Sequence, residues 1–129
     1  MIELRRRHPG RKFCLLSGGE VTVRIDRAPG TGGRNQQFAL ACALLFEQHL
    51  HGESVVCLSA GSDGADGNSP AAGAIVDPAT VARAQALGFD PQAALAAFDS
   101  YPLFTALGDT LVTGPTGNNL RDLRVLLSA

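Results

Sequence analysis

The chain has 129 residues and a formal net charge of −1 at pH 7, and its composition is 45% hydrophobic and 18% charged. These values are typical of one globular domain with a real core, and they exclude a disordered or fibrous chain. The first residues lack the apolar segment of a secretory signal, and no apolar run is long enough to cross a membrane. We therefore expect a cytoplasmic protein without a membrane partner.

Residues 1–11 are polar and basic and end in Pro9-Gly10, so we expect a leader or linker there and one α/β domain over residues 12–129. A basic arm can indicate nucleic-acid binding. Here the arm is short, lacks interleaved aromatic residues and precedes an acidic body, so no nucleic-acid partner is expected.

Two strands are predicted next, a buried one over residues 12–17 and an alternating one over residues 20–25. The segment between them is Ser17-Gly18-Gly19-Glu20. Taken alone, this segment is either the tight turn of a hairpin or a contact to a ligand.

A glycine-rich loop leads into the longest apolar helix, which is predicted over residues 35–50. Gly32 and Gly33 let the backbone approach a ligand closely or adopt positive φ. Arg34 follows at the start of the helix, where unpaired N–H groups and the positive end of the dipole favour an anion. The alternative is a tight turn that caps a core helix. The apolar stripe is so wide that we expect both sides of this helix to be covered.

Residues 54–59 form the best buried strand of the sequence, and a long loop follows with Asp63 and Asp66 among glycines. Hard cations such as Mg²⁺ prefer carboxylate oxygens, although the loop is not an EF-hand. The alternative is a pair of Asx-turns, in which the carboxylates accept hydrogen bonds from nearby backbone N–H groups.

The last part of the sequence predicts short helices over residues 78–87, 91–98 and 99–108, then strands over 110–113 and 122–127. Residues 113–119 form a second glycine-rich loop, whose hydroxyl and amide groups could bind an anion. It lacks the lysine of a P-loop, and the first glycine-rich loop lacks the third glycine of a dinucleotide fingerprint. Any nucleotide site must therefore be of another kind.

Strands and helices alternate, so we predict an α/β fold with three layers, α/β/α, and a mixed sheet covered on both faces. Polar loops directly follow apolar strands, where open α/β sheets place their ligands. Cys14, Cys42 and Cys57 each lie in an apolar run without metal-binding spacing, and we expect buried, reduced thiols.

Six motifs occur in the order of the MOFRL domain, the C-terminal domain of the glycerate 2-kinase family, and the chain resembles that domain from about Phe13 to Leu127. Many members of this family carry the label hydroxypyruvate reductase. The motifs are Leu-Ser-Gly-Gly-Glu (16–20), Gly-Gly-Arg-Asn-Gln (32–36), Ala-Gly-Ser-Asp-Gly-Ala-Asp-Gly (60–67), Ala-Ala-Gly-Ala (71–74), Asp-Ser-Tyr (99–101) and Thr-Gly-Pro-Thr-Gly-Asn (113–118).

The resemblance implies one wall of an active site that lies between two lobes and phosphorylates D-glycerate to 2-phosphoglycerate with ATP and Mg²⁺. Arg34 would then hold carboxylate or phosphoryl charge, and Asp63 and Asp66 would act in catalysis, with Asp63 as a Mg²⁺ ligand. The residues that would line the substrate and phosphate site are Ser17, Gly18, Gly19, Glu20, Gly32, Gly33, Asn35, Thr116, Gly117 and Asn118.

The family's N-terminal lobe, with its catalytic lysine, has no counterpart in these residues. We therefore expect a domain fragment, a truncated product or one half of a split enzyme, inactive until an N-terminal kinase lobe is supplied in cis or in trans. Two alternatives stay open: the reductase that the label describes, and a binding module without chemistry. A homodimer also stays open. Gln37 stands where the family usually has glutamate.

Overall fold

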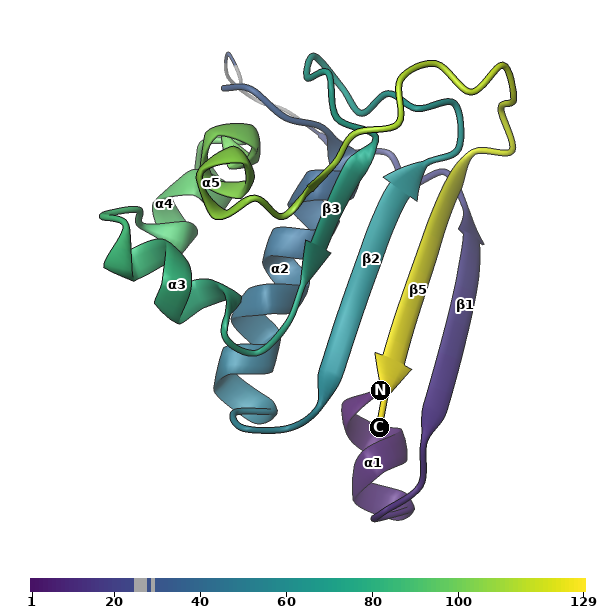
Figure 1. Ribbon diagram of the computed structural model, residues 1–129, viewed down its shortest axis with the longest axis vertical. Coiled ribbons are helices and arrows are strands. Elements are labelled where there is room, and N and C mark those ends of the chain that lie inside the picture. The colour runs from purple at the N-terminus through teal and green to yellow at the C-terminus, as the bar shows by residue number, and fades with distance from the viewer. Residues whose placement is uncertain (25–27, 29) are drawn as a thin grey trace.

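The structure is a computed structural model that describes residues 1–24, 28 and 30–129. Five strands form one sheet in the order β1-β5-β2-β3-β4, and a group of helices lies against it (Figure 1). The strands are β1 (Phe13–Gly19), β2 (Val55–Gly61), β3 (Gly73–Val76), β4 (Thr110–Leu111) and β5 (Asp122–Ser128). The helices are α1 (Ile2–Arg7), α2 (Arg34–His49), α3 (Thr80–Ala86), α4 (Pro91–Ala96) and α5 (Ser100–Leu107).

The last strand of the chain is inserted between the first two. β1 and β2 run in the same direction and are joined through α2, which is the connection that an alternating strand–helix pattern predicts. β5 returns between them in the opposite direction, and β3 and β4 continue the alternation. All described strand pairs are therefore antiparallel. The α/β class is confirmed, whereas the expectation of a mixed sheet is wrong because β5 separates the two parallel strands.

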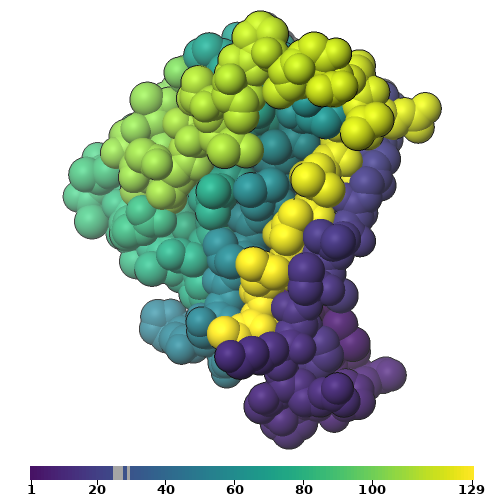
Figure 2. Space-filling model, turned by 45° about the vertical axis from the view of Figure 1, so that its right-hand side comes forward, coloured from purple at the N-terminus to yellow at the C-terminus, as the bar shows by residue number. Residues whose placement is uncertain are grey.

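The helices cover one face of the sheet. α2 packs against β2 and β3 on one side and against α3, α4 and α5 on the other, so its expected burial on both sides is confirmed. Leu40, Leu103 and Phe104 are fully buried in the core between these layers. The opposite face of the sheet has no helix across it (Figure 2). The second helical layer that we expected is thus absent from the described residues.

The predicted helix signals act as expected at the start of α4 and at the end of α5, whereas α3 begins at Thr80, two residues later than predicted. The side chain of Asp90 accepts a hydrogen bond from the backbone N–H of Ala93 at 3.0 Å, and Pro91 occupies the first turn. Gly108 ends α5 in the left-handed region with φ of 74°. These local signals place α4 and α5 close to the predicted boundaries.

The N-terminal third departs most from the prediction. The segment that we expected to be a leader or linker contains α1, whose Arg5 hydrogen-bonds Ser128 and forms an ion pair with Glu53. β1 continues through Gly18 and Gly19, which pair with β5, so no hairpin turn forms there. Residues 20–24 are not part of a strand, and residue 25 of that prediction lies outside the described residues.

Of the three cysteines, Cys42 and Cys57 are buried as expected, but Cys14 is exposed because β1 presents it on the uncovered face. No described helix combines the length and the apolar character that a membrane crossing would require.

The polar loops gather at one end of the sheet. The end of β1, the β2–β3 loop and the β4–β5 loop all lie at the top of the molecule in Figure 1. The two termini lie together at the opposite end. The loops share one end of the sheet because neighbouring strands are antiparallel. The carboxyl ends of β1 and β2 therefore lie beside the amino ends of β3 and β5.

Gly73 gives a direct test of the packing between β2 and β3. A Cβ atom on Gly73 would lie 1.9 Å from the carbonyl oxygen of Ser59, and the backbone would have to move. We expect Gly73→Ala to lower the free energy of unfolding by about 2–3 kcal/mol, measured by urea denaturation. Gly18→Ala is the matched control within a strand, since its Cβ would meet only an ordinary contact at 3.7 Å. Equal effects of the two substitutions would contradict this account.

Candidate functional site

The N-terminus of α2 already binds an anionic group, the carboxylate of Asp66. Asp66 Oδ1 accepts the backbone N–H of Asn35, and Oδ2 accepts that of Gln36, both at 2.9 Å. The side-chain amides of Asn35 and Gln36 donate to the same two oxygens at 3.2 and 3.1 Å. The sequence pattern indicated an anion at this helix end, and the structure places a residue of the chain itself there.

Asp66 is 2% exposed, and each of its oxygens accepts two hydrogen bonds. A carboxylate with this many donors has little capacity left for a metal ion or a substrate proton. The geometry therefore assigns Asp66 to positioning α2. Gly33 permits the close approach, because a Cβ atom there would lie 2.3 Å from Asp66.

Asn35 joins Asp66 to a second buried carboxylate. Its side-chain nitrogen donates to Asp66 Oδ1 and also, at 3.0 Å, to Asp122 Oδ1, while its oxygen accepts the hydroxyl of Ser59 at 2.7 Å. All four residues are buried. A buried polar network whose donors and acceptors are matched in this way holds its members in one arrangement, so α2, β2, β5 and the β2–β3 loop are connected through one amide.

Asp122 positions Arg34. The guanidinium donates from Nε to Asp122 Oδ2 at 2.8 Å and from Nη2 to Oδ1 at 2.9 Å, which is the two-pronged geometry of a strong arginine–carboxylate pair. Arg124 also donates to Asp122 Oδ2 at 3.1 Å, and its guanidinium stacks 5.0 Å from the ring centre of Phe38. Two cations thus balance the charge of one buried carboxylate.

The pKa values of this pair follow from the contacts. Burial by itself raises the pKa of Asp122, but hydrogen bonds from Arg34 and Asn35 and the charges of Arg34 and Arg124 outweigh it, so the pKa lies below its usual range. The hydrogen bond to Asp122 raises the pKa of Arg34 against the opposing effect of burial. Both groups are therefore charged at neutral pH.

The other edge of the Arg34 guanidinium is available to a ligand. Nη1 lies 3.2 Å from Glu20 Oε1, and the Glu20 side chain is 50% exposed. Such a pair is weak in water, so a ligand anion can replace Glu20 at small cost. A hollow of about 370 Å³ lies beside it. Its lining includes Glu20, Val21, Gly32, Gly33, Arg34 and Gln37.

Gln37 also lines this hollow. Its residue is 8% exposed, and Nε2 is buried without a hydrogen-bond partner among the described atoms. An unsatisfied buried amide is costly. Arg34 thus supplies the hollow with donors that match carboxylate or phosphate oxygens, and the lining also contains this buried, unpaired amide.

The glycine-rich loop is held from two sides. Asn68 accepts the N–H of Gly32 at 2.9 Å and donates to the carbonyl of Gly30 at 3.0 Å. Asp99 accepts the N–H of Thr31 at 2.7 Å. The loop is therefore fixed by the β2–β3 loop and by the start of α5, which brings three of the sequence motifs together.

Asp63 and the β4–β5 loop form a separate part of the same end. Asp63 is exposed, and its Oδ1 accepts the N–H of Ala65 at 3.1 Å, which is the Asx-turn alternative. Its carbonyl accepts the N–H of Thr116 at 3.1 Å, and the Thr116 hydroxyl donates to the carbonyl of Ser62. Gly117 and Asn118 are exposed beside them.

The described residues contain no group of three or more His, Cys, Asp or Glu side chains that could hold a metal ion. Mg²⁺ commonly takes one or two carboxylates and completes its shell with phosphate and water oxygens. Asp63 fits the role of one such ligand, because its Oδ2 is not engaged in a described hydrogen bond.

The structure does not bring all predicted site residues together. In the described part of the chain, no hydrogen bond or ion pair joins Asp63 or Thr116 to Arg34. Ser17, Gly18 and Gly19 lie in β1 opposite the first residues of β5, next to Asp122. These three residues therefore belong to a strand beside Asp122 and do not form a loop.

Sequence reasoning missed Asp122 and Arg124, which it treated as ordinary members of the last strand. Their spacing did carry a signal. Residues two positions apart in a strand lie on the same face of the sheet. An acid and an arginine on the inner face of an apolar strand therefore indicate a buried ion pair. Their contact with Arg34 spans 88 positions, and no local pattern could indicate it.

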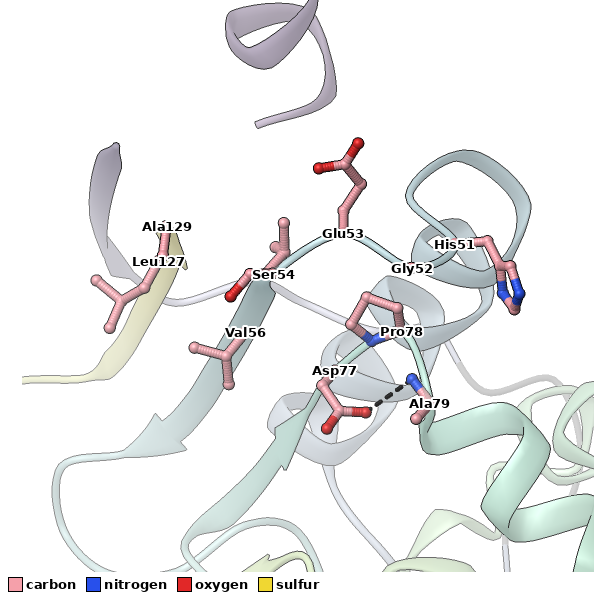
Figure 3. Close-up of a pocket in the computed structure, with 11 residues that line it drawn as sticks. His51, Gly52, Glu53, Ser54, Val56, Asp77, Pro78, Ala79, Leu127 and Ala129 are labelled. Atoms are coloured by element: carbon pink, nitrogen blue, oxygen red, sulfur yellow. Dashed lines mark hydrogen bonds between the residues drawn. The ribbon is translucent and has the colours of Figure 1, made fainter. Parts of the chain in front are cut away.

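A larger hollow of about 700 Å³ lies at the opposite end of β2 (Figure 3). Val56, Leu127, Pro78 and the segment of residues 51–54 line it. Asp77 also lines it, and its Oδ1 accepts the backbone N–H of Ala79 at 2.8 Å. None of the residues that line this hollow is one of the predicted site residues.

Comparison with known proteins places these features in a family. The model of the MOFRL family matches residues 13–122. A D-glycerate 2-kinase of Thermotoga maritima is 44% identical over 110 residues, which is 85% of this chain and 25% of the relative. A protein of Agrobacterium vitis named "Putative hydroxypyruvate reductase" is 46% identical over 115 residues, 88% of this chain and 25% of the relative.

A solved structure of glycerate kinase from Thermotoga maritima has a TM-score of 0.87 and 40% identity, and the match covers 99% of this chain and 31% of that one. The chain thus spans about a quarter of the length of the curated relatives that it matches.

Removal of the Asp122 charge should destabilise the fold. Asp122→Asn removes the buried counter-charge that Arg34 shares with the buried Arg124 and leaves only the exposed Glu20 beside Arg34, and we expect a loss of about 3 kcal/mol in the free energy of unfolding. Asp109→Asn is the matched control, because Asp109 also pairs with an arginine, Arg83, at a more exposed position. That change should cost about 1 kcal/mol or less. An equal or smaller effect of Asp122→Asn would contradict the central role of this carboxylate.

The lowered pKa of Asp122 also predicts a pH dependence. A carboxyl group whose pKa is lower in the folded state stabilises the fold above its unfolded pKa of about 3.9, and this stabilisation is lost as the pH falls through the lower, folded value. The difference in unfolding free energy between wild type and Asp122→Asn should therefore shrink below about pH 4. Urea denaturation from pH 7 to pH 3 measures it. A difference independent of pH would show that the charge of Asp122 does not contribute.

Proposed function

The chain belongs to the MOFRL family, and on that premise we propose that it supplies one wall of the active site of an ATP-dependent D-glycerate 2-kinase. The observation that carries the proposal is Arg34, which Asp122 holds by one edge while the other edge faces the hollow and an exposed partner, Glu20. Arginine in this state is oriented in advance for a second anion.

The substrates of such a reaction are anionic, since glycerate carries a carboxylate and ATP carries phosphates. Phosphoryl transfer depends mainly on positioning and on neutralisation of charge. In the proposal, Arg34 Nη1 binds the carboxylate of glycerate or the transferred phosphoryl group, and Gln37 Nε2 donates to a second oxygen. Asp66 and Asn35 fix α2 and so act as positioning residues.

The β4–β5 loop and Asp63 would complete the phosphate side of the wall. Thr116, Gly117 and Asn118 offer a hydroxyl and backbone amides, and Asp63 offers a carboxylate to Mg²⁺. When bound, Mg²⁺ would neutralise phosphate charge. Ser17, Gly18, Gly19 and Glu20 would bound the site at β1. A second lobe, in cis or in trans, would close the cleft, since the relatives are about four times as long as the matched region.

A chimera tests this function. The chain replaces the matching quarter of the Thermotoga maritima D-glycerate 2-kinase, and D-glycerate phosphorylation is measured with Mg-ATP. We expect Arg34→Lys to lower kcat/KM by about 10²-fold or more, because lysine keeps the charge but cannot bind Asp122 and a ligand together. Arg83→Lys, at the Asp109 pair in the helical layer, is the matched control and should have little effect.

Unchanged activity of Arg34→Lys would refute its role. Oxidation of NADH with hydroxypyruvate, without kinase activity, would favour the reductase. Binding of Mg-ATP and glycerate by an inactive chimera would indicate a binding module.

A further inference from the structure

We propose that Cys42 and Cys57 form a reversible disulfide when hydrogen peroxide oxidises the folded chain, and that this bond locks α2 onto β2. Cys42 belongs to α2 and Cys57 belongs to β2, and the two thiols hydrogen-bond each other in the core. Neither residue lines the hollow beside Arg34. The inference therefore does not depend on the proposed function.

The packing of α2 on the sheet brings the two cysteines to the same level. Asn35, at the beginning of α2, accepts the hydroxyl of Ser59 on β2 at 2.7 Å. Cys42 follows Asn35 by about two helical turns on the same side of α2. Cys57 precedes Ser59 by two positions and lies on the same face of β2. Because α2 and β2 run in opposite directions (Figure 1), both steps lead the same way through the core.

Arg124 gives a second, independent marker of this alignment. Its guanidinium lies 5.0 Å from the ring centre of Phe38, which precedes Cys42 by one turn of α2. Leu126 follows Arg124 on the same face of β5 and lies directly opposite Cys57. Contacts from two different strands therefore place Cys42 over Cys57.

The two thiols differ in how readily they ionise. The hydrogen bond with Cys57 and the charge of Arg124 lower the pKa of Cys42 against the opposing effect of burial. The hydrogen bond with Cys42 and burial raise the pKa of Cys57. Cys42 is 8% exposed, whereas Cys57 is fully buried. Since the thiolate is the reactive form of cysteine, Cys42 is the thiol that reacts first.

The oxidation then has two steps. The Cys42 thiolate attacks one oxygen of hydrogen peroxide, the O–O bond breaks, and the hydroxide that leaves takes up the proton released by Cys42 to form water. Cys42 is now a sulfenic acid. The Cys57 sulfur attacks the Cys42 sulfur, the S–O bond breaks, and the hydroxyl group leaves with the Cys57 proton as a second water. Two thiols lose two electrons to one peroxide.

The bond would act on the helix that carries Arg34 at its beginning. It would close the loop between residues 42 and 57, which contains the end of α2 and the start of β2. A cross-link of this kind restricts the unfolded chain and so stabilises the folded one. In a reducing compartment, disulfides of this type are transient and sense oxidants, so the reduced pair is the resting state of the lock.

Peroxide treatment of a Cys14→Ser chain tests the proposal. Cys14 is exposed on the sheet face away from α2, so its replacement removes disulfides between chains and leaves the core unchanged. After the peroxide is quenched, the chain is unfolded, and its thiols are alkylated and counted by mass spectrometry. The two alkylated thiols of the untreated chain should fall to none, and dithiothreitol should restore both.

Cys42→Ser and Cys57→Ser in this background are the matched controls, because each keeps one core thiol and a hydroxyl at the other position. With dimedone present during oxidation, the Cys57→Ser chain should carry the sulfenic-acid adduct on Cys42. The Cys42→Ser chain should carry at least about tenfold less adduct on Cys57. Equal labelling of the two would overturn the order of the steps.

The lock is measured by urea denaturation. Peroxide should raise the urea midpoint of the Cys14→Ser chain, and dithiothreitol should return it to the original value. The chain that also carries Cys42→Ser should show no rise. Two thiols that survive peroxide in the folded chain, or a loss that dithiothreitol does not reverse, would overturn the disulfide. An unchanged or lower midpoint after the bond has formed would overturn the lock.

Discussion

The structure depends on two carboxylates buried at the beginning of α2. Asp66 accepts the first backbone donors of the helix, and Asp122 accepts the guanidinium of Arg34 one residue earlier. A carboxylate buried without such donors is costly, and the donors around Asp122 keep its pKa below the usual range. Asn35 donates to both, so the two charges share one amide, and Arg34 and Arg124 supply the balancing cations.

This network explains why loops distant in sequence meet. Asp66 belongs to the β2–β3 loop and Asp122 begins β5, which enters the sheet between β1 and β2. The insertion of β5 places Asp122 below α2, and Asp122 in turn sets the direction of the Arg34 side chain. The helix N-terminus, which by general electrostatics attracts an anion from outside, is used here to hold the fold together. In the proposed function, the outer edge of Arg34 and the side chain of Gln37 would bind the ligand instead.

The molecule has two ends and two faces with different chemistry. The polar loops and the donor-lined hollow lie at one end, and the termini lie at the other. One face of the sheet is packed against α2, while the other exposes leucine side chains of β1 and β5, which are Leu16, Leu123 and Leu127. In the proposed function, the donors of the hollow would bind the ligand at the end of the sheet that carries the polar loops.

The sequence by itself determined α2 to α5 and the strands β1, β2, β4 and β5, because caps, prolines and glycines act within a few residues: Asp90 and Pro91 begin α4, and Gly108 ends α5. It did not indicate α1 or β3. It also indicated Arg34 and the glycine-rich loop as a candidate anion-binding site. Only the tertiary structure decided that β5 lies between β1 and β2, that Asp66 is occupied by α2, and that Asp122 directs Arg34. The contacts of Asp66 with Gln36 and of Asp122 with Arg34 join residues 30 and 88 positions apart, and β5 pairs with residues still more distant in β1. Their free energy comes from burial and charge pairing in the assembled fold, which no local pattern encodes.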